Sequence, residues 1–218
     1  LGAVNPLASL WALDPDVAYL NHGSFGACPS AVLAHQAELR RRIEREPFRF
    51  FARDLEGLLD RAREEAAGVF GASPEDLAFV PNATTGINTV LRSLDLGPGD
   101  EILTTDHLYN ACRTALEFTA GRTGARIVAA RVPFPLAAEG EIVEAVLDEV
   151  TDRTRFALLD HVTSATALVF PIGALVAPLR SAGIETIVDG AHAPGMVPLD
   201  LDRIGAAYYA GNAHKWLC

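Results

Sequence analysis

The chain has 218 residues, which is the length of one large domain or two small ones. Half of the residues are hydrophobic and 21% are charged, a balance that excludes a disordered tail or a collagen-like rod. The 28 acidic residues outnumber the 18 Lys and Arg residues, so the formal net charge is −10. Because neutralising phosphates requires surplus cations, this charge argues against a general nucleic-acid binder.

The cysteine pattern and the hydropathy indicate the surroundings in which the chain works. Cys28, Cys112 and Cys218 are scattered and odd in number, so we expect no disulfide framework and a reducing, cytoplasmic location. The sequence predicts no membrane span, because it has no uninterrupted apolar run of about 18 residues. Leu1–Leu10 resembles neither a signal nor a transit peptide. The dispersed histidines give no reason to expect a metal site.

The first 70 residues predict a loop followed by two helices. The loop contains the polar turn Asn21–Gly26. Apolar residues at steps of three and four predict a helix over Ser30–Glu46 and a second from about Asp54 to Phe70. Gly71 is placed to end the second helix.

From residue 71 onward, short apolar runs rich in β-branched residues alternate with helical patterns. The expected strands are Leu77–Val80, Glu101–Thr105, Arg126–Val132, Arg155–His161, Thr186–Asp189 and Ala206–Ala210. The expected helices are Thr84–Leu94, Ala111–Thr123, Ile142–Val150 and Ile172–Ala182. This alternation predicts a mostly parallel α/β sheet, and the near-continuous apolar runs predict helices on both of its faces. We therefore expect a loop and helical segment over residues 1–70 and an α/β domain over residues 71–218.

The chain stops at Cys218, directly after an expected strand and a polar loop. No closing helix follows, so we expect this sequence to be part of a longer protein. Ligands of open α/β sheets bind beyond the carboxyl ends of the strands, and the polar residues that follow each strand are therefore the candidates for a site.

The segment Asn82–Gly86 opens an expected helix with small and hydroxylated residues. Exposed backbone N–H groups and the helix dipole could hold a phosphate there. The alternative is an ordinary capping turn, with Asn82 or Thr84 as the N-cap.

Further polar residues follow the other strands. His107 and Tyr109 come after the second expected strand and could stack on a flat ring, although core and capping roles are the alternatives. Ser164 follows the fourth expected strand. Asp189 ends the fifth, and a buried acid there needs a cationic partner such as a protonated ring nitrogen, unless it caps a helix.

Lys215 is the only lysine in the chain and follows the last expected strand. A lysine near cations and apolar walls has a lowered pKa, and its neutral amine can attack a carbonyl to form a Schiff base. Arginine supplies surface charge equally well but cannot do this, because it stays protonated. A surface lysine left by a coding preference for arginine is the alternative. Asp189 and Lys215 would reach one crevice from neighbouring strand ends.

One ligand matches these residues together. Pyridoxal phosphate has a phosphate for the helix N-terminus, a ring for a stacking side chain, a pyridinium nitrogen for an acid and an aldehyde for a lysine. The sequence lacks the dinucleotide glycine turn, the Walker loop, the nucleophile elbow and the zinc helix of competing families.

Several motifs, taken as a set, resemble those of class V aminotransferase-fold enzymes, with isopenicillin N epimerase-like proteins as the most similar branch. The motifs are Tyr19–Gly26, Asn82–Thr84, Asp106–His107, Asp189–His192 and Asn212–Cys218. The resemblance runs from about Tyr19 to the last residue. It implies the large domain of a fold-type I pyridoxal 5′-phosphate enzyme, with the small C-terminal domain and its carboxylate-binding arginine beyond Cys218.

The resemblance also implies a role for each candidate residue. Lys215 would form the Schiff base with the cofactor, Asp189 would hold the pyridinium nitrogen, and His192 would lie near the ring phenolate. The phosphate contacts are expected from Asn82, Ala83, Thr84, Asn212 and His214, although Asn212 stands where many relatives have Ser or Thr. Tyr109 or His107 would cover the ring face, with Tyr109 favoured, and Ser164 would contact a ring oxygen.

The resulting hypothesis is a pyridoxal-phosphate enzyme, homodimeric when complete, that acts on an amino acid or a related amine. Epimerisation, elimination and transamination all stay open, because one fold hosts many reactions. None of the cysteines matches the mobile catalytic cysteine of the desulfurases. The rival readings are a non-catalytic α/β module that binds a phosphorylated metabolite through Asn82–Thr85, and an inactive fragment that docks on a full-length partner.

Overall fold

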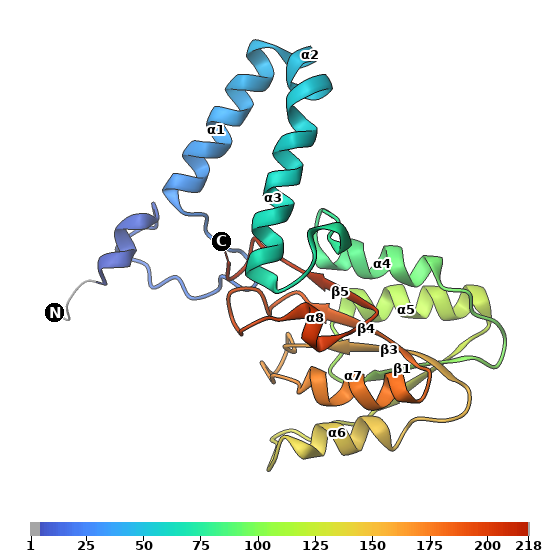
Figure 1. Ribbon diagram of the computed structural model, residues 1–218. Coiled ribbons are helices and arrows are strands. Elements are labelled where there is room, and N and C mark those ends of the chain that lie inside the picture. Colours follow the sequence, from blue (N-terminus) through green and yellow to red (C-terminus); the bar gives the residue numbers. More distant parts are fainter. Residues whose placement is uncertain (1–4, 218) are drawn as a thin grey trace.

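A five-stranded parallel sheet lies at the centre of the protein (Figure 1). The computed structural model describes residues 5–217, so Leu1–Val4 and Cys218, with the predictions made for them, lie outside the described residues. The strands are β1 (Glu101–Thr105), β2 (Arg126–Ala130), β3 (Thr154–Asp160), β4 (Glu185–Gly190) and β5 (Tyr208–Gly211). They lie in the order β2-β1-β3-β4-β5, and each neighbouring pair is parallel. The predicted fold class is confirmed.

The prediction of one strand is wrong. Leu77–Val80 forms no strand, although its composition is typical of one. A strand needs a neighbour for its backbone groups, and this segment pairs with neither edge strand of the sheet in the described part of the chain. Phe79 and Val80 are consequently exposed.

Helices cover both faces of the sheet, as the unbroken apolar runs predict. One face carries α4 (Ala83–Ser93) and α5 (Asn110–Thr123), and the other carries α6 (Gly140–Leu147) and α7 (Ile172–Ser181). Successive strand residues enter opposite cores: Leu158 packs on the α4–α5 side and Leu159 on the α6–α7 side. A short helix, α8 (Leu201–Ile204), precedes β5.

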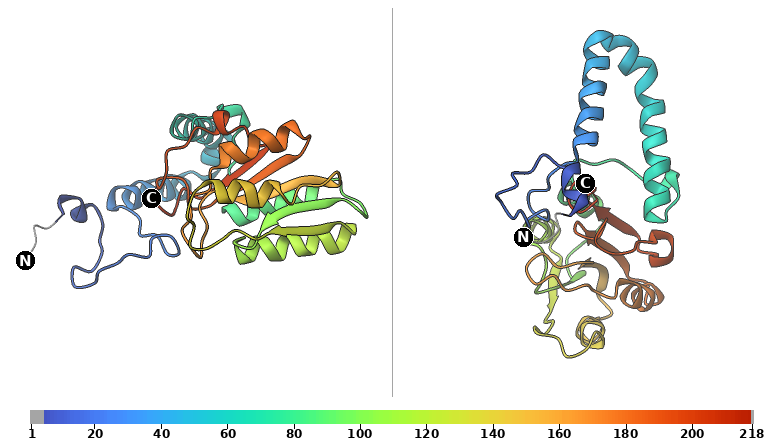
Figure 2. Two further views of the ribbon diagram at one scale, coloured as in Figure 1. Left: turned by 90° about the horizontal axis from the view of Figure 1, so that it is seen from below. Right: turned by 90° about the vertical axis from the view of Figure 1, so that its left-hand side faces the viewer.

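The N-terminal segment forms a helical arm that projects from the sheet (Figures 1 and 2). The arm consists of α1 (Ser30–Arg45), α2 (Pro47–Arg49), the π-helical turn η2 (Phe50–Asp54) and α3 (Leu55–Phe70). The 3₁₀ turns η1 (Pro6–Leu10) and η3 (Pro74–Asp76) lie before and after it. Both predicted helices are confirmed, and Gly71 ends α3 in the left-handed conformation with φ 61°. The division of the chain at residue 70 stays a prediction.

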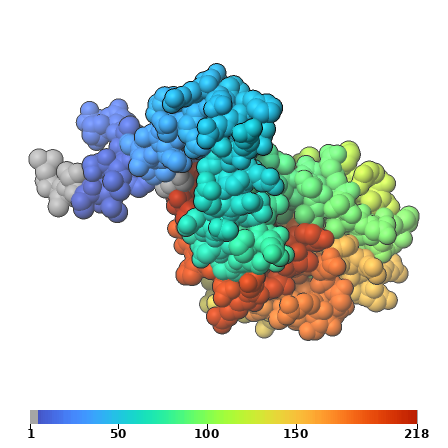
Figure 3. Space-filling view, turned by 45° about the horizontal axis from the view of Figure 1, so that its top comes forward, coloured from blue at the N-terminus to red at the C-terminus, as the bar shows by residue number. Residues whose placement is uncertain are grey.

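The base of the arm rests on the sheet domain. The backbone N–H of Asp202 in α8 donates a 2.9 Å hydrogen bond to the carbonyl of Gly71. In the space-filling view, α3 lies against the C-terminal segment (Figure 3). Among the described residues, no helix is long and apolar enough to cross a membrane.

Candidate active site

A small cavity lies at the carboxyl ends of β3 and β4, where ligands of open α/β sheets bind. It is lined by Tyr109, Asp160, Val162, Ser164, Asp189, Ala191, His192 and Lys215. The structure therefore brings five of the sequence-predicted site residues, Tyr109, Ser164, Asp189, His192 and Lys215, to one place.

Asp189 is the last acidic residue of β4 and is 3% exposed. Its Oδ1 accepts a 3.0 Å hydrogen bond from the backbone N–H of Ala191, and its Oδ2 accepts a 3.0 Å bond from the thiol of Cys112. These two donors hold the buried carboxylate in one orientation, with the cavity on its remaining side.

Lys215 lies in the loop after β5 and contacts His192. Its Nζ is 3.1 Å from His192 Nε2, while the indole N–H of Trp216 donates to His192 Nδ1 at 3.3 Å. Because an indole only donates, Nδ1 acts as the acceptor, and a neutral His192 then carries its proton on Nε2. That N–H can donate only to an unprotonated lysine amine.

The electrostatics of the pair agree with this geometry. Burial lowers the pKa of Lys215, and the negative charge of Asp189 opposes only part of that effect. The pKa of His192 is also lowered, first by burial and then by the charge of Lys215. Both shifts favour neutral side chains, and a neutral lysine amine is a nucleophile.

The loop after β5 carries Lys215 and is called the lysine loop. Close contacts with the backbone of another segment hold it in place. A Cβ on Gly26 would lie 3.3 Å from the carbonyl oxygen of Lys215 and closer still to that of His214. A Cβ on Gly23 would lie 2.8 Å from the Trp216 ring. The polar turn Asn21–Gly26 therefore packs directly on the lysine loop.

The start of α4 is tied to the same loop. Asn82 is the N-cap, and its Oδ1 accepts from Thr85 N–H at 2.8 Å, so the capping alternative for Asn82 is confirmed. The buried N–H of Ala83 donates at 2.8 Å to Oδ1 of Asn212. Thr84 follows in the first turn of α4, near the Cys112 thiol. The phosphate roles of these residues stay predictions.

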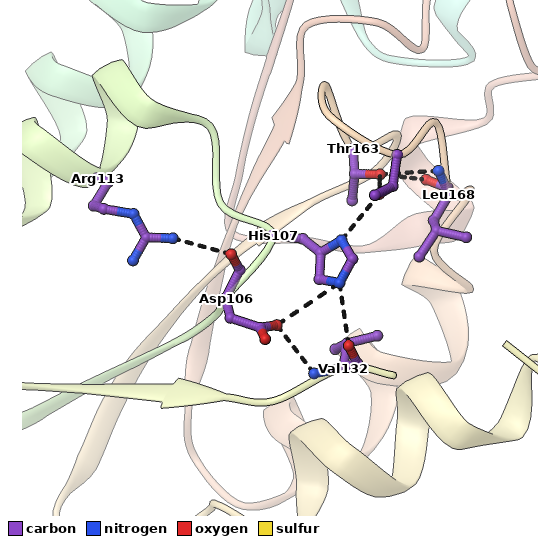
Figure 4. A network of polar contacts seen from close by, with 7 residues as sticks. Asp106, His107, Arg113, Val132, Thr163 and Leu168 are labelled. Carbon is purple, nitrogen blue, oxygen red and sulfur yellow. Dashed lines mark hydrogen bonds and ion pairs between the residues drawn. The ribbon is translucent and has the colours of Figure 1, made fainter. Parts of the chain in front are cut away.

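Two further predicted residues lie outside the lining of the cavity. His107 is held in a separate polar network (Figure 4), with Nδ1 2.9 Å from Thr166 Oγ1 and Nε2 3.1 Å from the carbonyl of Val132. Both of its ring nitrogens are thus occupied, whereas Tyr109 faces the cavity and is 42% exposed. His214 is exposed in the turn after β5.

Asp160 and Cys112 are residues of the site that the sequence analysis missed. Asp160 carries the same signal as Asp189, an acid at the end of an apolar strand, and could have been found in that way. Cys112 lies in α5, 77 residues before Asp189, whose carboxylate its thiol contacts. No local sequence pattern indicates that contact.

The fold and the position of the site define the large domain of a fold-type I enzyme, and solved structures agree. The cystine C–S lyase C-DES, in complex with its product cysteine persulfide, superposes with a TM-score of 0.84 at 26% identity, over 94% of this chain and 55% of that one. A C-DES mutant with glycine covalently linked to its pyridoxal phosphate cofactor also gives a TM-score of 0.84, at 27% identity, over 94% and 54% of the two chains.

The family follows from the sequence match. The model of the class-V aminotransferases matches residues 35–218, and this chain belongs to that family. Isopenicillin N epimerase of Streptomyces clavuligerus is 40% identical over 94% of this chain and 52% of its own length. A probable chloroplastic L-cysteine desulfhydrase of Arabidopsis thaliana is 34% identical over 93% and 46% of the two chains. The chain thus spans about half the length of the curated relatives that it matches.

Proposed function

We propose that the complete protein is a pyridoxal 5′-phosphate enzyme that acts on a small amino acid or a related amine. The observation that carries the proposal is the contact between Lys215 Nζ and His192 Nε2, beside the carboxylate of Asp189 in one cavity. The family and the C-DES complex with a linked cofactor support the same assignment.

The residues present fit this cofactor. Asp189 has a buried carboxylate whose remaining side faces the cavity, as an acid that holds a ring cation requires. Tyr109 can cover the ring face, and Ser164 can contact a ring oxygen. The first turn of α4, with Ala83 and Thr84, is oriented to favour an anion. When bound, the cofactor supplies an electron sink for charge that develops at the substrate's α-carbon.

Each residue of the chain then has a defined task. Lys215 would hold the cofactor through its Nζ, and the same Nζ would be placed to take or give a proton at the substrate's α-carbon. His192 donates its Nε2 proton toward Nζ and so favours the unprotonated amine. Asp189 keeps the ring nitrogen protonated by its negative charge.

The reaction class depends on where the proton returns. A proton returned to the opposite face of the α-carbon would give epimerisation, and loss of a leaving group from the substrate would give elimination. Transamination would use the cofactor as the acceptor of the amino group. Relatives named as an epimerase and as cysteine desulfhydrases support the first two.

We also propose that the complete protein is a cytoplasmic homodimer. Cys28 and Cys112 are free thiols, which suits a reducing compartment. Within residues 5–217, the arm leaves apolar side chains exposed: α1 has no buried residue, and Phe48 is 76% exposed. Sedimentation of the complete protein tests the dimer, and an active monomer would contradict it.

The central experiment is reduction with borohydride in the presence of pyridoxal phosphate, followed by peptide mapping. Lys215 is the only lysine, so we expect one label on Lys215 apart from any N-terminal amine. Lys215→Ala should lose the label and all turnover, and keep part of the non-covalent affinity. The control is Lys215→Ala combined with Arg41→Lys, which places a lysine at a position where the side chain is 68% exposed. Equal labelling of that lysine, or full turnover of Lys215→Ala, would contradict the proposal.

A further inference from the structure

Two carboxyl side chains lie next to each other at the floor of the cavity. Asp160 of β3 and Asp189 of β4 are register partners on adjacent parallel strands. Strands of one sheet lie about 4.8 Å apart, and residues in register point to the same face. Both side chains line the cavity, and they are only 2% and 3% exposed.

The two carboxyl groups differ in their hydrogen bonds. Each oxygen of Asp189 accepts a hydrogen bond, one from Ala191 N–H and one from the Cys112 thiol. The Oδ2 atom of Asp160 is buried and has no hydrogen-bond partner among the described residues. A buried carboxylate oxygen without a donor is costly when it is charged, and protonation of the carboxyl group removes that charge.

Among the described residues, no cationic side chain forms a hydrogen bond with Oδ2 of Asp160. Lys215 and His192, from the loops after β5 and β4, both have pKa values lowered by burial. Arg113 of α5 directs its guanidinium to the carbonyl of Asp106 at 3.2 Å. On the side of β5, the Tyr209 hydroxyl pairs with His161 Nδ1 at 2.8 Å, and burial keeps both of these groups neutral by raising the pKa of Tyr209 and lowering that of His161.

The pKa of Asp160 follows from these surroundings. Burial is the largest cause and the negative charge of Asp189 the second, and together they raise the pKa of Asp160 to about 8. The backbone N–H of Tyr109 and the charge of Arg113 lower it, but by less.

We propose that Asp160 holds a proton beside Asp189, so that the pair carries one negative charge at neutral pH and Asp189 is its ionised member. Asp160 is then a positioning residue: it keeps a single carboxylate, in a fixed orientation, facing the cavity. The existence of the pair stands on its own geometry, while its use for holding a cofactor ring rests on the proposed function.

The first test examines the cofactor-free complete protein by infrared spectroscopy at pH 7. A buried protonated carboxyl absorbs apart from the carboxylates, so the wild type should show one such band. Asp160→Asn should remove it, and the control Asp152→Asn, at an exposed turn before β3, should retain it. A wild type without the band, or a band that survives Asp160→Asn, would overturn the proposal.

Stability against pH gives a second readout. An acid whose pKa is raised in the folded state makes the protein progressively less stable as pH rises from the unfolded pKa toward about 8. Asp160→Asn should therefore unfold at a higher denaturant concentration than the wild type at pH 7. Its stability should also not decline between the unfolded pKa and pH 8 as that of the wild type does. An Asn variant with the wild-type pH slope would count against the proton on Asp160.

Titration with pyridoxal phosphate separates this inference from the proposed function. Because an amide can donate a hydrogen bond as a protonated carboxyl does, Asp160→Asn should bind the cofactor within about threefold of the wild type, whereas Asp160→Ala should lose roughly tenfold. If Asn weakens binding as much as Ala, an ionised Asp160 is required and the proposal fails. If the wild type itself does not bind the cofactor, the proposed function fails. The infrared result still decides whether Asp160 is protonated.

Discussion

The side-chain oxygen of Asn212 accepts a 2.8 Å hydrogen bond from the backbone N–H of Ala83, although 129 residues separate the two in sequence. Both residues are buried, at 6% and 1% exposure. The bond joins the first turn of α4 to the loop that carries Lys215. The candidate phosphate turn and the candidate nucleophile are therefore positioned by one shared contact.

Asn212→Ala should destabilise the protein, because it leaves a buried N–H without a partner. A cost of about 1–3 kcal/mol is typical of such a group, and denaturant unfolding measures it. The control is Asn88→Ala, which removes an exposed bond to Arg92 within α4 while gaining helix propensity, so the free energy of unfolding should change by less than about 0.5 kcal/mol. Equal losses in the two variants would mean that the Ala83 contact contributes nothing.

Gly26→Ala should displace the lysine loop. The added Cβ would meet the carbonyl oxygens of His22, His214 and Lys215, and backbone atoms cannot rotate away as a side chain can. We expect a loss of about 1–3 kcal/mol in the free energy of unfolding, with slower labelling of Lys215 by pyridoxal phosphate and borohydride.

The control for this variant is Gly121→Ala in α5, where an added Cβ would meet no atom within 4 Å. That change should stabilise the protein by about 0.5–1 kcal/mol, since alanine favours a helix more than glycine does. A Gly26→Ala protein as stable and as reactive as the wild type would show that the turn does not constrain the lysine.

Asp189→Asn should shift the titration of Lys215. The negative charge of Asp189 raises the pKa of Lys215 against the effect of burial, so removing that charge should lower the pKa further. The reaction of the lone lysine with trinitrobenzenesulfonate, followed against pH, should then reach its midpoint at lower pH than in the wild type. Asp152→Asn should leave the midpoint in place, and a shift to higher pH would contradict this reading.

The same Asp189→Asn variant should fold and yet lose turnover in the complete protein, by roughly 10²-fold. A neutral amide cannot hold a ring proton as strongly as a carboxylate can, so charge at the α-carbon is less well stabilised. Steady-state kinetics and circular dichroism measure the two properties. Wild-type turnover in this variant would remove Asp189 from the proposed mechanism.

Cys112 should resist alkylation. Burial, followed by the negative charge of Asp189, raises the pKa of the Cys112 thiol well above its usual value, so the reactive thiolate is scarce at pH 8. Treatment with iodoacetamide and peptide mapping should find label on the half-buried Cys28 before Cys112. Both should react once the protein is unfolded, and a Cys112 that reacts as fast as Cys28 in the folded protein would contradict its contact with Asp189.

Local sequence patterns sufficed for most of the elements. The strand Glu101–Thr105 was predicted with its observed ends, because a run that is apolar on both faces reports burial whatever its neighbours are. The end of α3 at Gly71 also follows from local chemistry, since glycine adopts positive φ without strain. Leu77–Val80 has an equally apolar run but no partner, and a local pattern does not reveal which strands pair.

For the site, the residue types at the strand ends indicated its chemistry. Asp189 lies at the end of β4 and Lys215 follows the neighbouring β5, and in a parallel sheet those ends meet. The choice between His107 and Tyr109 depended on packing, because Thr166 and Val132 occupy both ring nitrogens of His107. The pairing of Asp160 with Asp189 depended on strand register in the same way. Composition and spacing report what each residue can do chemically, whereas contacts between residues far apart in the chain, set by the packing of sheet and helices, select those that act together.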